Sequence, residues 1–171
     1  MDEIVYKASE IFISSLIGND IASQKNPNIV FQYPFSSRIS ELHSDAPANS
    51  FYEIVSWVPL VNCHSTKSFY ILNKDKSREL INKYKQNSFN TWSEYTKEAI
   101  ENATHLKIDY GSALFFWSGL LHGSVTNETK ESRWSYNVRY KNLFAPSGMK
   151  DPLVFYRVFK KSHITFLANE K

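Results

Sequence analysis

The sequence predicts a mainly β protein built as a double-stranded β-helix, the jelly roll of the cupins, with a few peripheral helices. Many short segments combine aromatic and β-branched residues, and aromatic side chains make up 15% of the 171 residues. Helical patterns are few, and one long polar insertion interrupts the strands. A chain of this length suits one domain over 1–171, with a short N-terminal helix at 2–17 and a jelly-roll core over about 29–165.

Three segments show the pattern of a helix. The first is 2–17, which Gly18 can end, and the second is 77–85. The third begins after Thr91, where Thr-x-x-Glu to Glu94 matches a capping box. In the first segment, the apolar side of an amphipathic helix is expected from the residues at helical spacing: Ile4, Ala8, Ile11, Phe12 and Leu16.

Strands are expected where apolar, aromatic and β-branched residues gather. The clearest is 133–144, in which polar and aromatic residues alternate. The other expected strands are 29–33, 51–61, 106–110, 113–117 and 151–159.

Composition excludes several classes of function. The net charge of +3 is small and the basic residues are scattered, which argues against nucleic-acid binding. No apolar run approaches membrane-spanning length, and the acidic start Met1-Asp2-Glu3 is unlike a targeting peptide. The single cysteine, Cys63, permits no intrachain disulfide. We expect a cytoplasmic protein with a small-molecule substrate, no nucleic-acid or membrane partner, and a homo-oligomer as an open option.

Two histidines and an aspartate suggest a metal site. His43 and Asp45 are two residues apart, so a strand would direct both side chains to one face. His122 follows 79 residues after His43 (122 − 43 = 79), a separation that a jelly roll can close. Two imidazoles and one carboxylate form the set that suits Fe(II) and leaves positions for a co-substrate and oxygen. Alone the motif is weak, since His43 also fits a turn histidine and His122 a satisfied core histidine.

Arg133 strengthens this interpretation. In the expected strand, Arg133 shares a face with Ser135, Asn137 and Arg139, and these four polar residues should line a cavity because burial without partners is costly. A guanidinium can hold the distal carboxylate of 2-oxoglutarate by two parallel hydrogen bonds. Alternatively, Arg133 and Arg139 are exposed residues on a half-buried strand. The other face should pack into the core or against a helix through Trp134, Tyr136, Val138 and Tyr140.

Four motifs in this order resemble the phytanoyl-CoA dioxygenase superfamily over about residues 30–165. They are His43-x-Asp45, Gly111-Ser-Ala-Leu-Phe-Phe, His122-Gly-Ser-x-x-Asn127, and Arg133 followed by Asn-Val-Arg-Tyr. The chain looks most similar to small bacterial oxygenases of carbohydrate-biosynthesis gene clusters, related to a streptomycin-pathway protein. In that subgroup the arginine strand also runs into Lys-Asn-Leu-Phe-x-Pro, here residues 141–146.

The resemblance implies a dioxygenase that uses Fe(II), 2-oxoglutarate and O2, and that hydroxylates a small polar metabolite such as a sugar or sugar derivative. It maps the iron ligands onto His43, Asp45 and His122, and the co-substrate arginine onto Arg133. The helper hydroxyl is Ser124 by family position or Ser135 by strand geometry. Related halogenases leave the carboxylate position open for chloride, so Asp45 favours hydroxylation. An aromatic residue near the metal would be Trp57, and further pocket candidates are Tyr52, Trp117, Trp134 and Arg139.

Two other functions remain open. A cupin-type metalloenzyme without 2-oxoglutarate would not need Arg133, and a non-enzymatic sugar-binding jelly roll would not need the triad. One departure from the family also matters, because only 42 residues precede His43. Fewer residues there are consistent with a more exposed site, with a pocket completed by a second subunit, or with a trimmed chain.

Overall fold

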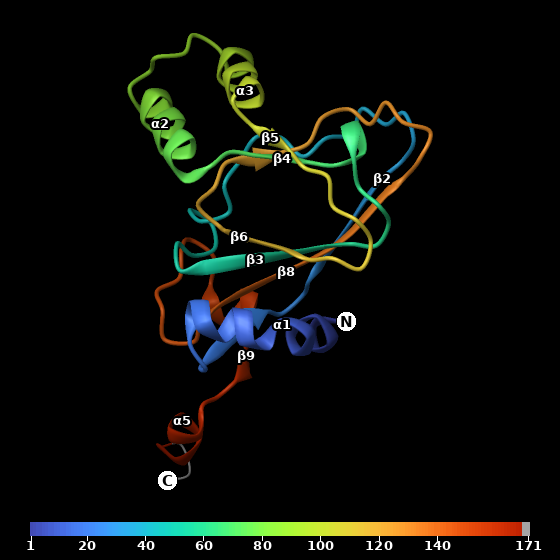
Figure 1. The fold of residues 1–171 in the computed structure, drawn as a ribbon. Helices are drawn as coiled ribbons and strands as arrows, with labels where there is room; N and C mark the ends of the chain where they lie inside the picture. The colour runs from blue at the N-terminus through green and yellow to red at the C-terminus, as the bar shows by residue number, and fades with distance from the viewer. Residues whose placement is uncertain (169–171) are drawn as a thin grey trace.

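The computed structural model describes residues 1–168, and its strands form two antiparallel sheets. The larger sheet has six strands in the order β6-β3-β8-β1-β9, with β2 also paired to β8, and the smaller has the order β5-β4-β7 (Figure 1). The strands of the larger sheet are β1 Ile21–Gln24, β2 Asn28–Gln32, β3 Glu53–Pro59, β6 Leu114–Trp117, β8 Arg133–Asn142 and β9 Tyr156–Lys160. Those of the smaller sheet are β4 Tyr70–Ile71, β5 Thr104–His105 and β7 His122–Gly123.

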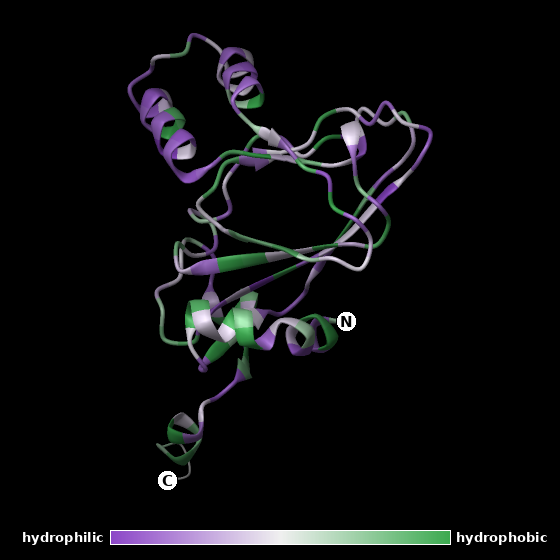
Figure 2. Cartoon of the chain, in the orientation of Figure 1, coloured by the Kyte–Doolittle hydropathy of each residue, from purple (hydrophilic) through white to green (hydrophobic). Residues whose placement is uncertain are grey.

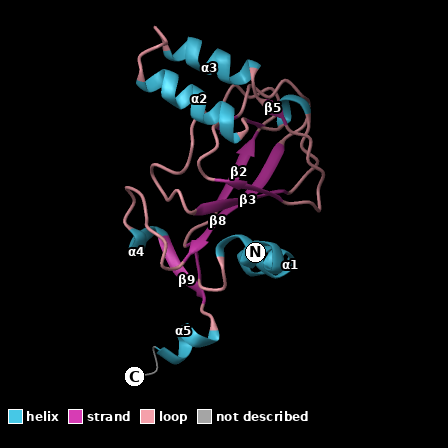
Figure 3. Ribbon diagram, turned by 60° about the vertical axis from the view of Figure 1, so that its left-hand side comes forward, coloured by secondary structure: helices cyan, strands magenta, loops and turns pink. Residues whose placement is uncertain are grey.

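Helices cover the outer sides of both sheets. Helix α1 (Asp2–Ile17) lies under β8, whereas α2 (Lys74–Lys85) and α3 (Trp92–Glu101) lie side by side over the smaller sheet (Figures 1 and 3). Figure 2 shows mostly hydrophilic residues on α2 and α3. The buried apolar side chains of these two helices pack against the smaller sheet. Three short elements complete the chain: the 3-10 helix η1 Ser65–Lys67, α4 Pro152–Phe155 and α5 His163–Ala168. No helix within residues 1–168 combines the length and the hydropathy that crossing a membrane requires.

The predicted capping box is present at α3. The Thr91 hydroxyl accepts a hydrogen bond from the Glu94 backbone N–H at 3.1 Å. The Glu94 carboxylate accepts in turn from the backbone N–H of Asn90, one residue earlier than the usual arrangement. The two bonds fix where the helix starts and therefore where its apolar side meets the smaller sheet.

Helix α1 was predicted with correct ends but with the wrong buried face. It ends at Gly18, whose φ of 83° favours glycine. Its buried residues are Val5, Tyr6 and Ile13, and Tyr6 packs edge-on against Phe159 at a ring-centroid distance of 5.0 Å. Most of the residues expected on the buried side are exposed instead: Ile4, Ile11, Phe12 and Leu16. The aromatic side chains of β8 and β9 select the face that carries Tyr6.

Strand β8 is the centre of the fold, as its alternation predicts. Tyr136, Val138 and Tyr140 are buried between β8 and α1. Trp134, at the start of the same face, packs against Phe31 outside this cluster. The opposite, polar face of β8 points into the space between the two sheets.

Several strand predictions were incomplete. No strand was predicted at β1, β4, β5 or β7, and 106–110 forms only an isolated bridge between Cys63 and Ile108. The expected strand at 151–159 begins as a helix, because the Asp151 side chain accepts from the Leu153 N–H at 2.8 Å and Pro152 suits the first helical position. Strand β9 follows and ends at Lys160.

Candidate metal centre

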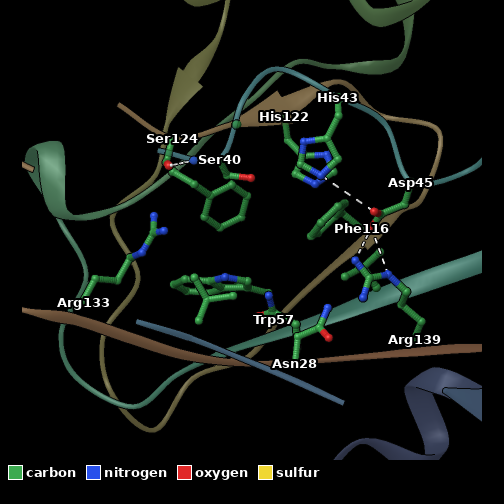
Figure 4. Close-up of a pocket in the computed structure, with 15 residues that line it drawn as sticks. Asn28, Ser40, His43, Asp45, Trp57, Phe116, His122, Ser124, Arg133 and Arg139 are labelled. Carbon is green, nitrogen blue, oxygen red and sulfur yellow. Dashed lines mark hydrogen bonds and ion pairs between the residues drawn. The ribbon is translucent and has the colours of Figure 1, made fainter. Parts of the chain in front are cut away.

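The structure brings His43, Asp45 and His122 to one point between the sheets. One ligand atom from each residue lies within 4.8 Å of the others. The His43 Nε2 and Asp45 Oδ1 atoms are 3.8 Å apart, and the two imidazole centroids are 4.2 Å apart (Figure 4). The motif that spans 79 residues in the sequence is thus a compact cluster.

Backbone pairing places the two histidines side by side. His43 and His122 form a bridge that extends the smaller sheet, with reciprocal N–H···O bonds of 3.0 and 2.9 Å. The next residue, Gly123, is needed for close packing, because a Cβ there would lie 2.5 Å from the Tyr70 hydroxyl oxygen. Asp45 is fixed separately, since its N–H donates to the Ser118 carbonyl at 3.0 Å.

Both imidazoles have a defined tautomer. The Nδ1 of His43 lies 2.7 Å from the Glu41 carbonyl oxygen, and the Nδ1 of His122 lies 2.9 Å from that of Leu120. A carbonyl oxygen can only accept, so each Nδ1 carries the hydrogen and each Nε2 keeps its lone pair. This is the orientation that metal-binding histidines generally have.

The two histidines differ in exposure. Burial, and secondarily the neighbouring His43, lowers the pKa of His122 to about 4. Its imidazole is therefore neutral at neutral pH and can bind a cation without first losing a proton. The His43 side chain is 42% exposed, so it lies at the mouth of the site, where solvent has access.

Arg139 holds one oxygen of Asp45. Its Nε and Nη2 atoms donate to Asp45 Oδ2 at 3.0 and 2.7 Å, and its Nη1 donates to Gln24 Oε1 at 3.0 Å. Oδ1 is left facing His43. The sequence indicated that Arg139 shares a face with Arg133, but it did not reveal this contact with Asp45.

A buried carboxyl group, Glu53, lies on the other side of Arg139. Its Oε2 accepts a hydrogen bond from the Tyr156 hydroxyl at 2.5 Å, and its Oε1 lies 3.6 Å from Arg139 Nε. Burial raises the pKa of Glu53 to about 7, because desolvation outweighs the hydrogen bond from Tyr156 and the charge of Arg139. Glu53 was not predicted as a site residue, because in the sequence it looks like an ordinary strand residue.

Glu53 should make stability depend on pH. Its folded-state pKa of about 7 exceeds the ordinary value of 4.5, so its contribution is complete below pH 4.5 and is lost as the pH rises through about 7. The test is urea unfolding from pH 4.5 to 8. As the pH rises across this range, the unfolding free energy of the unmodified protein should fall relative to that of Glu53→Gln. A difference that stays constant would contradict the assignment.

Arg133 lies across the cavity from Asp45 and Arg139 (Figure 4). Its Nη1 donates to the Ser68 carbonyl at 2.7 Å, its Nε has no partner, and no carboxylate within residues 1–168 pairs with it. Burial lowers the pKa of this guanidinium. A buried cation without a counter-ion is costly, so the cavity is suited to an anion at this end.

The two candidate serines lie in different places. Ser124 lines the cavity, and its Oγ accepts a hydrogen bond from the Ser40 N–H at 2.8 Å, which leaves the hydroxyl hydrogen free to donate. Ser135 is fully buried, its Oγ has no partner in the described structure, and it is not among the cavity-lining residues.

The cavity has a volume of about 160 Å³. Its apolar walls are Val30, Val55, Trp57, Phe69 and Phe116. Trp57 is thus near the triad, as the resemblance implied. Three other aromatic candidates lie elsewhere: Tyr52 and Trp117 line a separate surface hollow, and Trp134 packs on Phe31.

One family model matches part of the chain. The family model described as phytanoyl-CoA dioxygenase matches residues 68–135, a segment that contains His122, Ser124 and Arg133. No curated protein sequence matches the chain.

Three of the similar solved structures show the range of the matches. The non-haem monooxygenase ThoJ in its apo form is 16% identical, with a TM-score of 0.62. The match covers 82% of this chain and 54% of the ThoJ chain. SnoN, an α-ketoglutarate-dependent epimerase of nogalamycin biosynthesis, is 18% identical with a TM-score of 0.56, covering 83% and 57%. HygX from Streptomyces hygroscopicus, with nickel and 2-oxoglutarate bound, is 11% identical with a TM-score of 0.61, covering 83% and 65%.

The predicted jelly-roll fold is therefore confirmed by its likeness to these structures. The chain spans about half to two thirds of the length of these three structures. A segment of it matches the phytanoyl-CoA dioxygenase model. Similarity to the carbohydrate-cluster subgroup remains a prediction.

Proposed function

We propose that this chain is an Fe(II)- and 2-oxoglutarate-dependent dioxygenase that hydroxylates a small polar metabolite, such as a sugar or sugar derivative. One observation carries the proposal. A cluster of two imidazoles and a carboxylate shares a cavity with a buried guanidinium that has no counter-ion among residues 1–168. Neither half of this arrangement is explained by packing alone.

The donor atoms fit Fe(II). His43 and His122 offer Nε2 lone pairs, and Asp45 offers Oδ1 while Arg139 holds Oδ2. Two nitrogens and one oxygen leave further coordination positions for a chelating co-substrate and for oxygen. When bound, iron would activate O2, which is the oxidant, and 2-oxoglutarate would supply two of the four electrons that reduce it, leaving as succinate and CO2.

Arg133 and Ser124 would bind the distal carboxylate of 2-oxoglutarate. The guanidinium brings a charge that no residue in the described part of the chain neutralises, and Ser124 brings a free hydroxyl hydrogen from the same cavity. We prefer Ser124 to Ser135 because only Ser124 lines the cavity. The need for Arg133 also supports this function over a cupin-type metalloenzyme without 2-oxoglutarate.

The remaining walls would exclude water from the reacting groups. Trp57, Phe69 and Phe116 are buried and face the cavity, so they leave few competing hydrogen-bond partners. Asp45 occupies the carboxylate position, which supports hydroxylation over halogenation.

Arg133→Ala tests the co-substrate assignment. Hydrogen bonds to charged groups contribute about 1.5–3 kcal/mol, so the affinity for 2-oxoglutarate should fall roughly ten- to hundredfold. Affinity for Fe(II) alone should be unchanged, because Arg133 contacts none of the three ligands. The measurement is anaerobic titration, in which the Fe(II)–2-oxoglutarate complex gives a visible charge-transfer band.

Arg78→Ala, an exposed change on α2, is the matched control and should bind both ligands normally. Normal 2-oxoglutarate binding by Arg133→Ala would show that another group holds the distal carboxylate.

A further inference from the structure

Two asparagines face each other across the strands that form the floor of the cavity. Asn28 of β2 is the register partner of Asn137 of β8, and both line the cavity. Asn137 lies on the polar face of β8 between Arg133 and Arg139. Figure 4 shows Asn28 on the Arg139 side of Trp57, away from Arg133.

The two side chains differ in exposure, because Asn28 is exposed to solvent whereas one polar atom of Asn137 is buried. The Asn137 Oδ1 atom is buried and has no partner within residues 1–168. Asn28 Oδ1 accepts only a long bond of 3.4 Å from Gln24 Nε2, which also donates to the Asn26 carbonyl at 2.7 Å. A buried acceptor without a donor costs about 1–3 kcal/mol, so the arrangement suits a ligand that supplies the donor.

Charge narrows the class of ligand. Three lining residues other than the histidines carry a charge, and Arg139 is neutralised by Asp45. Arg133 is assigned to the co-substrate. The cavity then offers no charged partner to the substrate, and a charged group entering it would be buried without compensation.

A carboxamide offers both a donor and an acceptor. Two carboxamides side by side can therefore bind adjacent hydroxyl or amide groups, each of which also donates and accepts. Their position near Arg139 and Asp45, and not beside the carboxylate anchor, places them where a substrate would face the metal ligands.

We propose that Asn28 and Asn137 form a substrate-binding pair, and that the part of the substrate entering the cavity is uncharged and rich in hydroxyl or amide groups. This inference rests on the proposed function, because it assumes that 2-oxoglutarate occupies Arg133.

Binding to the protein loaded with Ni(II) and 2-oxoglutarate tests the inference without turnover. By calorimetry, methyl glucoside should bind, whereas glucuronate and glucosamine should bind at least about tenfold more weakly, because their charges lack a partner. Failure of methyl glucoside to bind, or equal binding by glucuronate, overturns the inference.

Variants identify the residues responsible. Asn28→Ala and Asn137→Ala should each weaken methyl glucoside binding about tenfold and leave the affinity for 2-oxoglutarate unchanged. Asn137→Asp should shift the preference towards glucosamine, because it adds a negative charge. Asn82→Ala, an exposed change on α2, should have no effect.

The two proposals fail in different ways. An Asn137→Ala protein that loses 2-oxoglutarate but keeps methyl glucoside would make Asn137 a co-substrate residue and overturn the inference. If the unmodified Ni(II) protein did not bind 2-oxoglutarate, the proposed function itself would fall.

Discussion

His122→Ala should abolish tight Fe(II) binding. The imidazole is one of three ligand groups, and its Nε2 is held towards the others by the bond from Nδ1–H to the Leu120 carbonyl. Loss of a hydrogen-bonding partner behind a ligand typically costs roughly 10–100-fold in metal affinity, so loss of the ligand itself should cost more than about a hundredfold. Anaerobic titration with Fe(II), or with Co(II) followed by its visible absorption, measures the change.

His163→Ala serves as the control, because His163 is exposed on α5 and takes no part in the cluster. It should bind metal as the unmodified protein does. Circular dichroism should show that both variants are folded. If His122→Ala kept its affinity within a few-fold, the metal would have to be bound elsewhere.

Arg139→Met should be among the most destabilising single changes in the protein. Asp45 and Arg139 are both buried, and removing the guanidinium leaves a buried carboxylate with no cation to pair with. Breaking a buried ion pair in this way costs about 3–5 kcal/mol. Urea unfolding at neutral pH should show a loss of this size.

Arg157→Met is a matched comparison. Arg157 also forms an ion pair with an aspartate, Asp2, but both side chains are partly exposed, so the loss should be below about 1 kcal/mol. Adding Asp45→Asn to Arg139→Met should recover part of the stability, because the unpaired charge disappears. If both arginine variants lost the same unfolding free energy, the Asp45–Arg139 pair would not be shielded from solvent.

The sequence was sufficient for the elements and residues whose local pattern is strong. Strand β8 alternates over its whole length, so its buried aromatic face and its polar face were both predictable. The sequence predicted that His43, Asp45 and His122 meet, and the fold brings them together in one cavity with Arg133. However, His43 and Asp45 are placed by a single bridge and a bend and not by a regular strand.

The remaining features depend on contacts between distant segments. Strands β4 and β7 have two residues each, too few for an alternating pattern. Helix α1 carries apolar residues on more than one side, and only packing against Phe159 and Tyr140 decides which side is buried. The clamp of Arg139 on Asp45 joins residues 94 positions apart, and no local pattern encodes it.

A single ladder of hydrogen bonds determines whether the site exists. Arg133 and Arg139 extend from the same face of β8, one towards each end of the cavity, and the paired asparagine lies between them. Because side chains alternate along a strand, a shift of β8 by one residue would turn both guanidiniums to the opposite face of the sheet and bring the apolar face of β8 into the cavity. An insertion or deletion between these two arginines should therefore turn at least one of them away from the cavity. Length changes in the surface loop joining α2 and α3 would leave the site intact.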